Sequence, residues 1–207
     1  MVNIAVIDYG MGNLHSACKG LEKAGATTKI TDSAAEITAA DAVVLPGVGA
    51  FDPAMKQLRH TGLEPVIKET IASGKPFFGI CVGFQMLFES SEEGNLPGLG
   101  IIPGKVKRFY GEPEIAIPHM GWNQLDLTQP QHPLWDRLKP SPYLYFVHSY
   151  YAELASSDVC AATVTHGSQT VTAAIAKDNL MAVQFHPEKS SDNGLQILSN
   201  FVSFVSG

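Results

Sequence analysis

The sequence is poor in cysteine, in charged residues and in long apolar runs. Its three cysteines are too few, and odd in number, for a disulfide framework, which indicates a reducing compartment. Only 16% of the residues are charged, whereas 45% are hydrophobic, enough for a sizeable core. No apolar run approaches the roughly 20 residues that span a bilayer. The amino-terminal residues are predicted to form a strand rather than a signal segment. We therefore expect a cytoplasmic protein that does not enter membranes.

Basic residues are also scarce. There are 14 Lys and Arg against 20 Asp and Glu, which gives a formal net charge of −6. The densest basic segment, Lys105, Lys107 and Arg108, is typical of the exposed face of a strand. Because nucleic acids bind basic patches, we expect no nucleic-acid partner. The seven histidines show no metal-ligand spacing with cysteines or carboxylates, so we expect no metal or cofactor. The roles of His119 and His148 stay open.

Strands and helices alternate in the first part of the chain. Strands are predicted at 3–8, 27–31, 42–45 and 76–80, and helices at 14–24, 51–61 and 63–73. This alternation predicts an α/β fold, an open and mostly parallel sheet with helices on both faces. Three glycine-rich turns, at 8–13, 46–51 and 79–83, follow strands at the edge where such sheets form their sites.

The middle of the chain changes character. From 94 to about 142 glycine and proline are frequent, with strands predicted at 104–109, 123–126 and 143–146 and one short helix near 134–138. We expect an antiparallel elaboration on one edge of the sheet. Strands at 160–164, 170–176 and 181–185 and a helix at 194–205 complete the prediction. With no repeat and no long linker, residues 1–207 are predicted to form one domain, with Cys18 and Cys160 buried.

The segment 75–88 carries the strongest functional signal. A short apolar strand leads into a tight turn in which Gly79 and Gly83 flank Cys81 at two residues on either side, and a helix follows. This is the pattern of a nucleophile elbow with cysteine in place of serine. The glycines leave room beside the reactive atom. The helix N-terminus favours the thiolate form of the cysteine.

A partner for this cysteine lies near the other end of the chain. Pro187 favours an extended conformation at His186, which would turn His186 and Glu188 toward one site. His186 would then take the thiol proton and Glu188 would orient the imidazole, as in a catalytic triad. A lone cysteine or a lone His-Pro-Glu tripeptide is weak evidence. Their combination with the elbow glycines predicts catalysis.

Attack on a carbonyl also needs donors for the oxyanion. The amide of Val82, next after the nucleophile, is one candidate. The turn containing Val48 and Gly49 is the best source of a second donor, because glycine-flanked peptides can present N–H groups inward. The first turn does not complete a dinucleotide-binding loop, since His15 stands where the third glycine would be.

Together these segments resemble the class I, triad-type glutamine amidotransferases. The signs are the elbow at 79–85 (GICVGFQ), the turn at 46–49 (PGVG) and the triad at 186–188 (HPE). Further segments are similar to the glutaminase subunits of imidazole glycerol phosphate synthase, a family of histidine biosynthesis: 8–13 (DYGMGN), 118–123 (PHMGWN), 148–151 (HSYY) and 186–190 (HPEKS). The resemblance runs the length of the chain and implies a flavodoxin-like fold.

The resemblance implies L-glutamine as the substrate. Cys81 is implied to attack the side-chain amide and form a thioester, with His186 protonating the departing ammonia and then activating water. The residues implied to hold the glutamine are Gly49, through its backbone, and Gln85, Ser149 and Tyr150. In the absence of the resemblance, the last three would be read as ordinary capping and packing residues.

The chain has no recognisable pocket for an ammonia acceptor. The resemblance implies a heterodimer with a second protein, a (β/α)₈ cyclase subunit, which receives ammonia through a tunnel. It also implies low glutaminase activity until the partner's site is occupied. The implied docking face carries Pro118, Trp122, Asn123 and Lys189. From the sequence, Trp122 is either an aromatic interface anchor or a core residue.

Three other functions remain open at this point. The chain could serve another acceptor pathway, such as pyridoxal phosphate, anthranilate or aminodeoxychorismate synthesis; the triad does not separate these, but the flanking motifs do. It could be a non-catalytic module on the same fold, although a complete triad argues against that. It could also be a γ-glutamyl peptidase.

Overall fold

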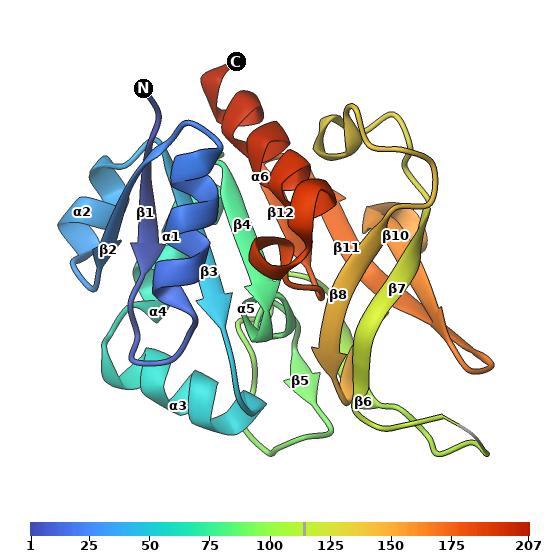
Figure 1. Ribbon diagram of the computed structural model, residues 1–207. Helices are drawn as coiled ribbons and strands as arrows, with labels where there is room; N and C mark the ends of the chain where they lie inside the picture. Colours follow the sequence, from blue (N-terminus) through green and yellow to red (C-terminus); the bar gives the residue numbers. More distant parts are fainter. Residues whose placement is uncertain (114) are drawn as a thin grey trace.

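A mixed sheet runs through the computed structural model, which describes residues 1–113 and 115–207 (Figure 1). The parallel strands are ordered β2-β1-β3-β4-β12. Their bounds are Thr27–Thr31 for β2, Asn3–Ile7 for β1, Ala42–Gly47 for β3, Phe77–Cys81 for β4 and Leu180–Val183 for β12. Strands β3, β4 and β12 are buried over their whole length, as expected for apolar strands covered on both faces.

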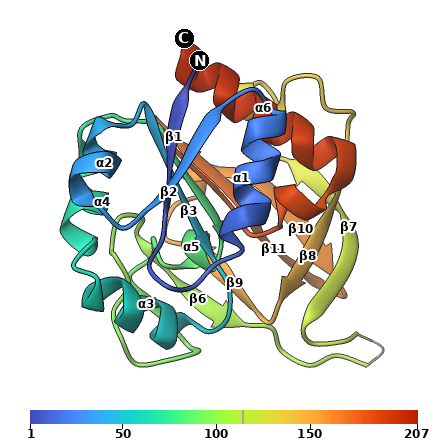
Figure 2. The same ribbon diagram turned by 60° about the vertical axis from the view of Figure 1, so that its left-hand side comes forward.

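Helices cover both faces of the parallel part, as predicted (Figures 1 and 2). On one face α1 (Leu14–Lys23) packs against the long carboxyl-terminal α6 (Ser191–Ser206). On the other, α2 (Ala34–Ala39) packs against α4 (Glu64–Ala72), and α3 (Phe51–His60) packs against α5 (Val82–Gln85). The short α2 was not predicted, because six residues are too few to show a helical apolar period.

An antiparallel region continues the sheet beyond β12, which confirms the predicted elaboration. The order there is β12-β11-β10-β7-β8, with β9 paired to β11 and β6; the short β5 pairs with β6 in parallel. The bounds are Gln169–Lys177 for β11, Cys160–His166 for β10, His119–Leu127 for β7, Tyr143–His148 for β8, Tyr150–Leu154 for β9, Gly104–Arg108 for β6 and Ser90–Ser91 for β5. The separate strand β9 was not predicted, and β7 is longer than the predicted 123–126.

Two predicted helices are shorter than expected. The helix expected near 134–138 is a single 3₁₀ turn, Pro133–Trp135, because Asn200 Nδ2 donates to the carbonyls of Leu134 and Asp136 and neither of these carbonyls continues a helix. The elbow helix α5 ends at Gln85, not at residue 88. The carbonyls of residues 86–88 instead accept backbone hydrogen bonds from the loop at 99–102.

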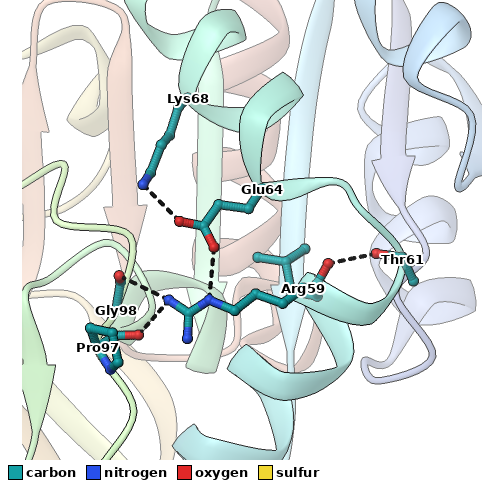
Figure 3. Close-up of polar contacts among 7 residues, drawn as sticks. Arg59, Thr61, Glu64, Lys68, Pro97 and Gly98 are labelled. Carbon is teal, nitrogen blue, oxygen red and sulfur yellow. Dashed lines mark hydrogen bonds and ion pairs between the residues drawn. The ribbon is translucent and has the colours of Figure 1, made fainter.

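Polar contacts fix the loop that follows the elbow. Arg59, at the end of α3, donates through Nε to Glu64 Oε2 at 2.8 Å and through Nη2 to the carbonyl of Pro97 at 2.7 Å (Figure 3). Lys68 binds the other oxygen of Glu64 at 2.7 Å. These contacts tie the α3–α4 connection to the segment at 97–98.

The buried hydrophobic side chains form one contiguous cluster that joins the two parts of the sheet. Phe78 of β4 stacks on Phe201 of α6, with ring centroids 5.0 Å apart, and Phe146 of β8 meets Phe185 edge to face at 5.7 Å. Cys18 and Cys160 are both buried and free, as predicted. Over the part of the chain that the structure describes, no helix is both long and apolar enough to cross a bilayer.

Candidate active site

Cys81 lies at a strained point of the backbone. It ends β4 and immediately precedes α5, with φ 56° and ψ −110°, a combination that non-glycine residues avoid. Such strain is typical of a nucleophile elbow and costs on the order of 1–3 kcal/mol. The predicted strand–cysteine–helix elbow is therefore present.

The elbow glycines are required because α5 packs directly on β3. A Cβ on Gly83 would overlap the carbonyl oxygen of Leu45. A Cβ on Gly79 would lie 3.0 Å from Cβ of Ala182 on the neighbouring strand. On β3 itself, a Cβ on Gly47 would lie 2.6 Å from the backbone nitrogen of Gly83. These glycines permit the close approach of neighbouring elements that holds the elbow in place.

A cavity of about 370 Å³ opens directly over Cys81. It lies between the carboxyl end of the parallel strands and the start of β9 in the antiparallel region. Its lining residues are Val48, Gly49, Cys81, Val82, Gln85, Glu93, Pro118, Val147, His148, Ser149, Tyr150, His186 and Lys189. All predicted oxyanion and glutamine-binding residues are thus brought to one cavity, together with the nucleophile and the base.

His186 and Glu188 form a buried pair behind this cavity. His186 Nδ1 and Glu188 Oε1 are 2.8 Å apart, and both side chains are almost fully buried. Burial on its own lowers the pKa of His186, but interaction with Cys81 and with Glu188 outweighs it and raises that pKa to about 10. The imidazole thus interacts with a sulfur on one side and a carboxylate on the other, the order of groups expected for a nucleophile, its base and the residue that orients the base.

The route by which Glu188 reaches His186 differs in part from the prediction. His186 itself is extended, as expected before proline, with φ −103° and ψ 95°. The chain then enters a 3₁₀ turn, Pro187–Lys189, instead of continuing as a strand. Ser190 fixes this turn, since its Oγ donates to the His186 carbonyl at 2.6 Å. The two side chains meet because of the turn, not because of the i, i+2 geometry of a strand.

The predicted oxyanion turn lines the same cavity as the imidazole. Gly49 has φ +87°, a conformation suited to glycine, and the apolar side chain of Val48 is 37% exposed. Val82 is the first residue of α5, so its N–H has no acceptor within the helix. The far end of the turn is held by Glu93, whose Oε2 accepts from the Phe51 amide at 2.8 Å.

Three cavity residues escaped prediction. Glu93 lines the cavity together with Tyr150, and burial raises its pKa, with the negative charge of Asp52 adding to the increase. Val147 precedes the predicted 148–151 motif, and His148 lines the cavity although its role was left open. Glu93 lies in a polar turn, where nothing in the spacing marks one carboxylate out from its neighbours.

The residues predicted to dock a partner divide into two groups. Pro118 and Lys189 line the cavity. Trp122 is 53% exposed and meets Tyr145 edge to face, so the alternative of a core tryptophan is wrong. Asn123 is half-buried, with its amide nitrogen bonded to His119 and to the carbonyl of Thr165. In the described residues, no group of three or more His, Cys, Asp or Glu side chains is arranged to hold a metal ion.

Comparison with known proteins agrees with this geometry. Residues 5–204 match the family "Glutamine amidotransferase class-I". An imidazole glycerol phosphate synthase subunit HisH from Trichormus variabilis is 72% identical over 202 residues, covering 98% of this chain and 96% of the relative. One from a Cyanothece species is 71% identical over 205 residues, covering 99% and 97%.

A solved structure shares the fold at low sequence identity. The structure of PurLQS from Thermotoga maritima contains a chain that is similar with a TM-score of 0.75 at 17% identity, covering 99% of this chain and 99% of that one. The fold, the elbow and the sequence matches lead to one assignment. The chain belongs to the class-I glutamine amidotransferase family and, within it, to the HisH subunits of imidazole glycerol phosphate synthase.

Proposed function

We propose that this chain hydrolyses L-glutamine as the glutaminase subunit of imidazole glycerol phosphate synthase and passes the ammonia to a cyclase subunit. The observation that carries the proposal is the meeting of Cys81 and the His186–Glu188 pair at the strained elbow beneath one cavity. The identity of 72% to a HisH subunit, over nearly the whole of both chains, supports the choice of pathway.

The reaction uses the thiolate and imidazolium as a pair. The Cys81 sulfur bonds to the side-chain carbonyl carbon of glutamine, and the carbonyl oxygen becomes an oxyanion near the amides of Val82 and the turn at 48–49. His186 gives its proton to the departing nitrogen as the C–N bond breaks, which leaves ammonia and a thioester. The imidazole then takes a proton from water, whose oxygen attacks the thioester. Glutamate leaves, and the thiolate–imidazolium pair is restored. Glu188 orients the ring in both steps.

The cavity offers different groups for the two ends of an amino acid. Glu93 presents a carboxylate for an α-ammonium group, whereas Ser149, Tyr150 and the backbone of Gly49 supply neutral hydrogen-bonding groups. Gln85 lines the same cavity, next to Tyr150. We assign these residues to glutamine binding, which adds Glu93 to the set expected from the sequence.

The proposed docking surface for the cyclase is the exposed side of β7 together with the cavity mouth. Met120 and Trp122 point to solvent from β7, 62% and 53% exposed, while Pro118 and Lys189 lie beside the cavity. Large exposed apolar side chains next to a catalytic opening suit a protein partner, which would also shield released ammonia from water. A reducing cytoplasm suits the three free thiols.

The test is glutamate release from glutamine by the protein alone and with the cyclase subunit plus its ribotide ligand. We expect strong stimulation by the liganded partner and loss of activity in Cys81→Ala. Cys160→Ala, which removes another buried thiol in β10, is the matched control and should keep the activity. Activity without stimulation by this partner would support glutamine hydrolysis but contradict the proposed role in imidazole glycerol phosphate synthesis.

The substrate class has its own test. We expect a glutamine-analogue alkylating agent to label Cys81 and free glutamine to protect it. Protection by γ-glutamyl peptides but not by glutamine would favour the peptidase alternative. No protection by either ligand would overturn the amidotransferase proposal.

A further inference from the structure

A chain of hydrogen bonds begins at the half-buried Asn123 and leads into the buried interior, and the donor and acceptor of each bond are fixed from both ends. Asn123 Nδ2 lies 2.8 Å from the carbonyl of Thr165, which can only accept, so the amide nitrogen and not the oxygen occupies this position. The same nitrogen is 3.0 Å from His119 Nε2, which must therefore accept. His119 then carries its proton on Nδ1, which faces His148 Nε2 at 3.1 Å.

The other end demands the same arrangement. His148 Nδ1 lies 2.8 Å from the carbonyl of Tyr150 and must donate to it. His148 Nε2 is then free of hydrogen and accepts from His119. A proton added to either ring would place two donors face to face. The two imidazoles are therefore neutral, with one allowed tautomer each.

The chain continues from Tyr150 to the nucleophile. Gln85 Nε2 donates to the same Tyr150 carbonyl at 3.1 Å and to Gln184 Oε1 at 2.9 Å. Because the oxygen of Gln184 is taken in this way, its Nε2 points to the other side, where Cys81 Sγ lies 3.9 Å away. Gln184 is 0% exposed and Gln85 3% exposed, so the bond between their amides and the contact with the sulfur are shielded from water.

We propose that Gln184 is a further residue of the reacting centre, donating its amide N–H to the Cys81 sulfur, and that the chain from Asn123 fixes this orientation. A thiolate in a buried elbow needs donors to replace water, and a neutral amide donor stabilises it without transferring a proton to it. His119 and His148 act as positioning residues, because they hold the Tyr150 carbonyl that orients Gln85. The inference deepens the proposed function, since it concerns the same nucleophile.

The test measures alkylation of Cys81 by iodoacetamide as a function of pH, which requires no glutamine turnover. Gln184→Leu removes the donor, and we expect about three- to tenfold slower alkylation at neutral pH, with the midpoint moved to higher pH. Gln184→Glu keeps an acceptor for Gln85 but places a carboxylate beside the sulfur, so we expect a larger shift. The other groups that interact with the sulfur, His186 and Tyr9, stay unchanged in both variants.

The remote part of the chain is tested with two histidines of one cluster. His119→Leu breaks the chain, whereas His166→Leu is the matched control. The His166 ring stacks on His119 with centroids 4.2 Å apart, but its Nε2 bonds to the carbonyl of Ala116 outside the chain. We expect the alkylation profile to shift in His119→Leu in the same direction as in Gln184→Leu, and to stay in place in His166→Leu. Equal shifts in both would show loosened packing and overturn the positioning role.

A measurement on the unchanged protein covers the case in which Gln184 variants fail to fold. With ¹⁵N-labelled glutamine side chains, the Gln184 amide signal should move as the Cys81 thiol ionises and lose that movement in Cys81→Ser. A Gln184 amide signal that does not move as the Cys81 thiol ionises would overturn the proposal. Altered alkylation in the variants, alongside a wild type without glutaminase activity, would uphold this inference and reject the proposed function.

Discussion

The pKa values of buried histidines are shifted in opposite directions on the two sides of the cavity. On the parallel side His186 is paired with Glu188 and with the nucleophile, which raises its pKa to about 10. On the antiparallel side burial, together with the charge of His166, lowers the pKa of His119 to about 4. Burial, with smaller contributions from neighbouring histidines, lowers that of His148 to about 3. All three side chains are buried.

The difference shows that the partner, not burial, decides the charge of a buried imidazole. Where a carboxylate accepts from the ring, the cation is stabilised and the ring can give a proton to a leaving group. Where other neutral rings and carbonyls surround it, the cation is excluded and the ring serves only as a directed hydrogen-bond link. The first arrangement is suited to proton transfer in catalysis. The second is suited to keeping the side of the cavity in a fixed conformation.

The largest effect is expected when the carboxylate beside His186 is removed. In Glu188→Gln we expect kcat/KM for glutamate release to fall by about a hundredfold or more, because the ring loses its orienting acceptor and the cation its counter-charge. Glu153→Gln is the control, since Glu153 pairs with Lys107 on the exposed surface of the antiparallel region and should change the rate less than about twofold. Similar losses in both variants would contradict the assigned role of Glu188.

Lowering the pH should reduce the stability of the protein through the buried histidines of the antiparallel region. Since the folded-state pKa values of His119 and His148 lie below the ordinary 6.5, their stabilising contribution is complete above pH 6.5 and is lost as the pH falls toward 4. For His119 this amounts to up to about 3 kcal/mol of unfolding free energy. His186 has the opposite sign: its contribution is complete below pH 6.5 and is lost as the pH rises toward 10.

Urea unfolding at a pH of about 7.5, 6 and 4.5 measures the acid effect across this window. We expect His119→Leu to lose less stability between these pH values than the wild type does. His15→Gln, a change at an exposed position of α1, should leave the wild-type slope in place. Parallel slopes for the wild type and His119→Leu would show that the neutral cluster does not carry this effect.

A smaller effect is expected from adding a methyl group at a closely packed glycine of the parallel region, compared with a glycine in open space. In the parallel part Gly83→Ala would push a methyl group into the Leu45 carbonyl, so we expect a loss of about 2 kcal/mol in unfolding free energy. Gly111→Ala, where a Cβ meets nothing within 4 Å, should change it by less than about 0.5 kcal/mol. Thermal unfolding of the two variants measures both losses. Equal losses would mean that the substitutions act on the unfolded chain and not through a clash in the folded protein.

The smallest expected effect on the isolated protein is at the proposed docking surface. Trp122→Ala should leave stability nearly unchanged, because half of the ring is already in solvent. It should weaken the affinity for the cyclase partner about tenfold, as expected for an aromatic anchor at an interface. Tyr110→Ala removes a ring that is 58% exposed outside that surface and serves as the control. Calorimetric titration with the cyclase partner measures the affinity of both variants. Equal affinities would show that Trp122 does not belong to the interface.

The parallel side could be predicted well from the sequence because its signals are local. Strands β1, β3 and β4 are short apolar runs, and the elbow glycines stand within two residues of Cys81. The same is true of His186 and Glu188, although the turn that joins them was expected to be a strand. Short segments with one dominant physical requirement, burial or close approach, are visible without knowledge of the fold.

The antiparallel side could be predicted only in outline. Strands β6, β7 and β8 alternate between buried and more exposed positions, so their apolar pattern is weak. The break at Ser149, between β8 and β9, has no signal in the local sequence. The bond between Gln85 and Gln184 joins residues 99 positions apart, and that between His119 and His148 joins residues 29 apart. No periodicity encodes such pairs. Glu93 and Gln184 were missed for this reason.

The polar chain that starts at Asn123 is terminated by amide groups at each end of its imidazole section. An amide N–H and a peptide carbonyl neither release nor take up protons near neutral pH, so this section transmits geometry but no charge. Under the proposed function, this section therefore takes no part in the proton transfers, which run among the thiol, the His186 ring, water and the substrate. The two neutral imidazoles of the chain cannot convert departing ammonia into ammonium. The nitrogen would leave the cavity with its lone pair intact, in the form that a partner enzyme can use as a nucleophile.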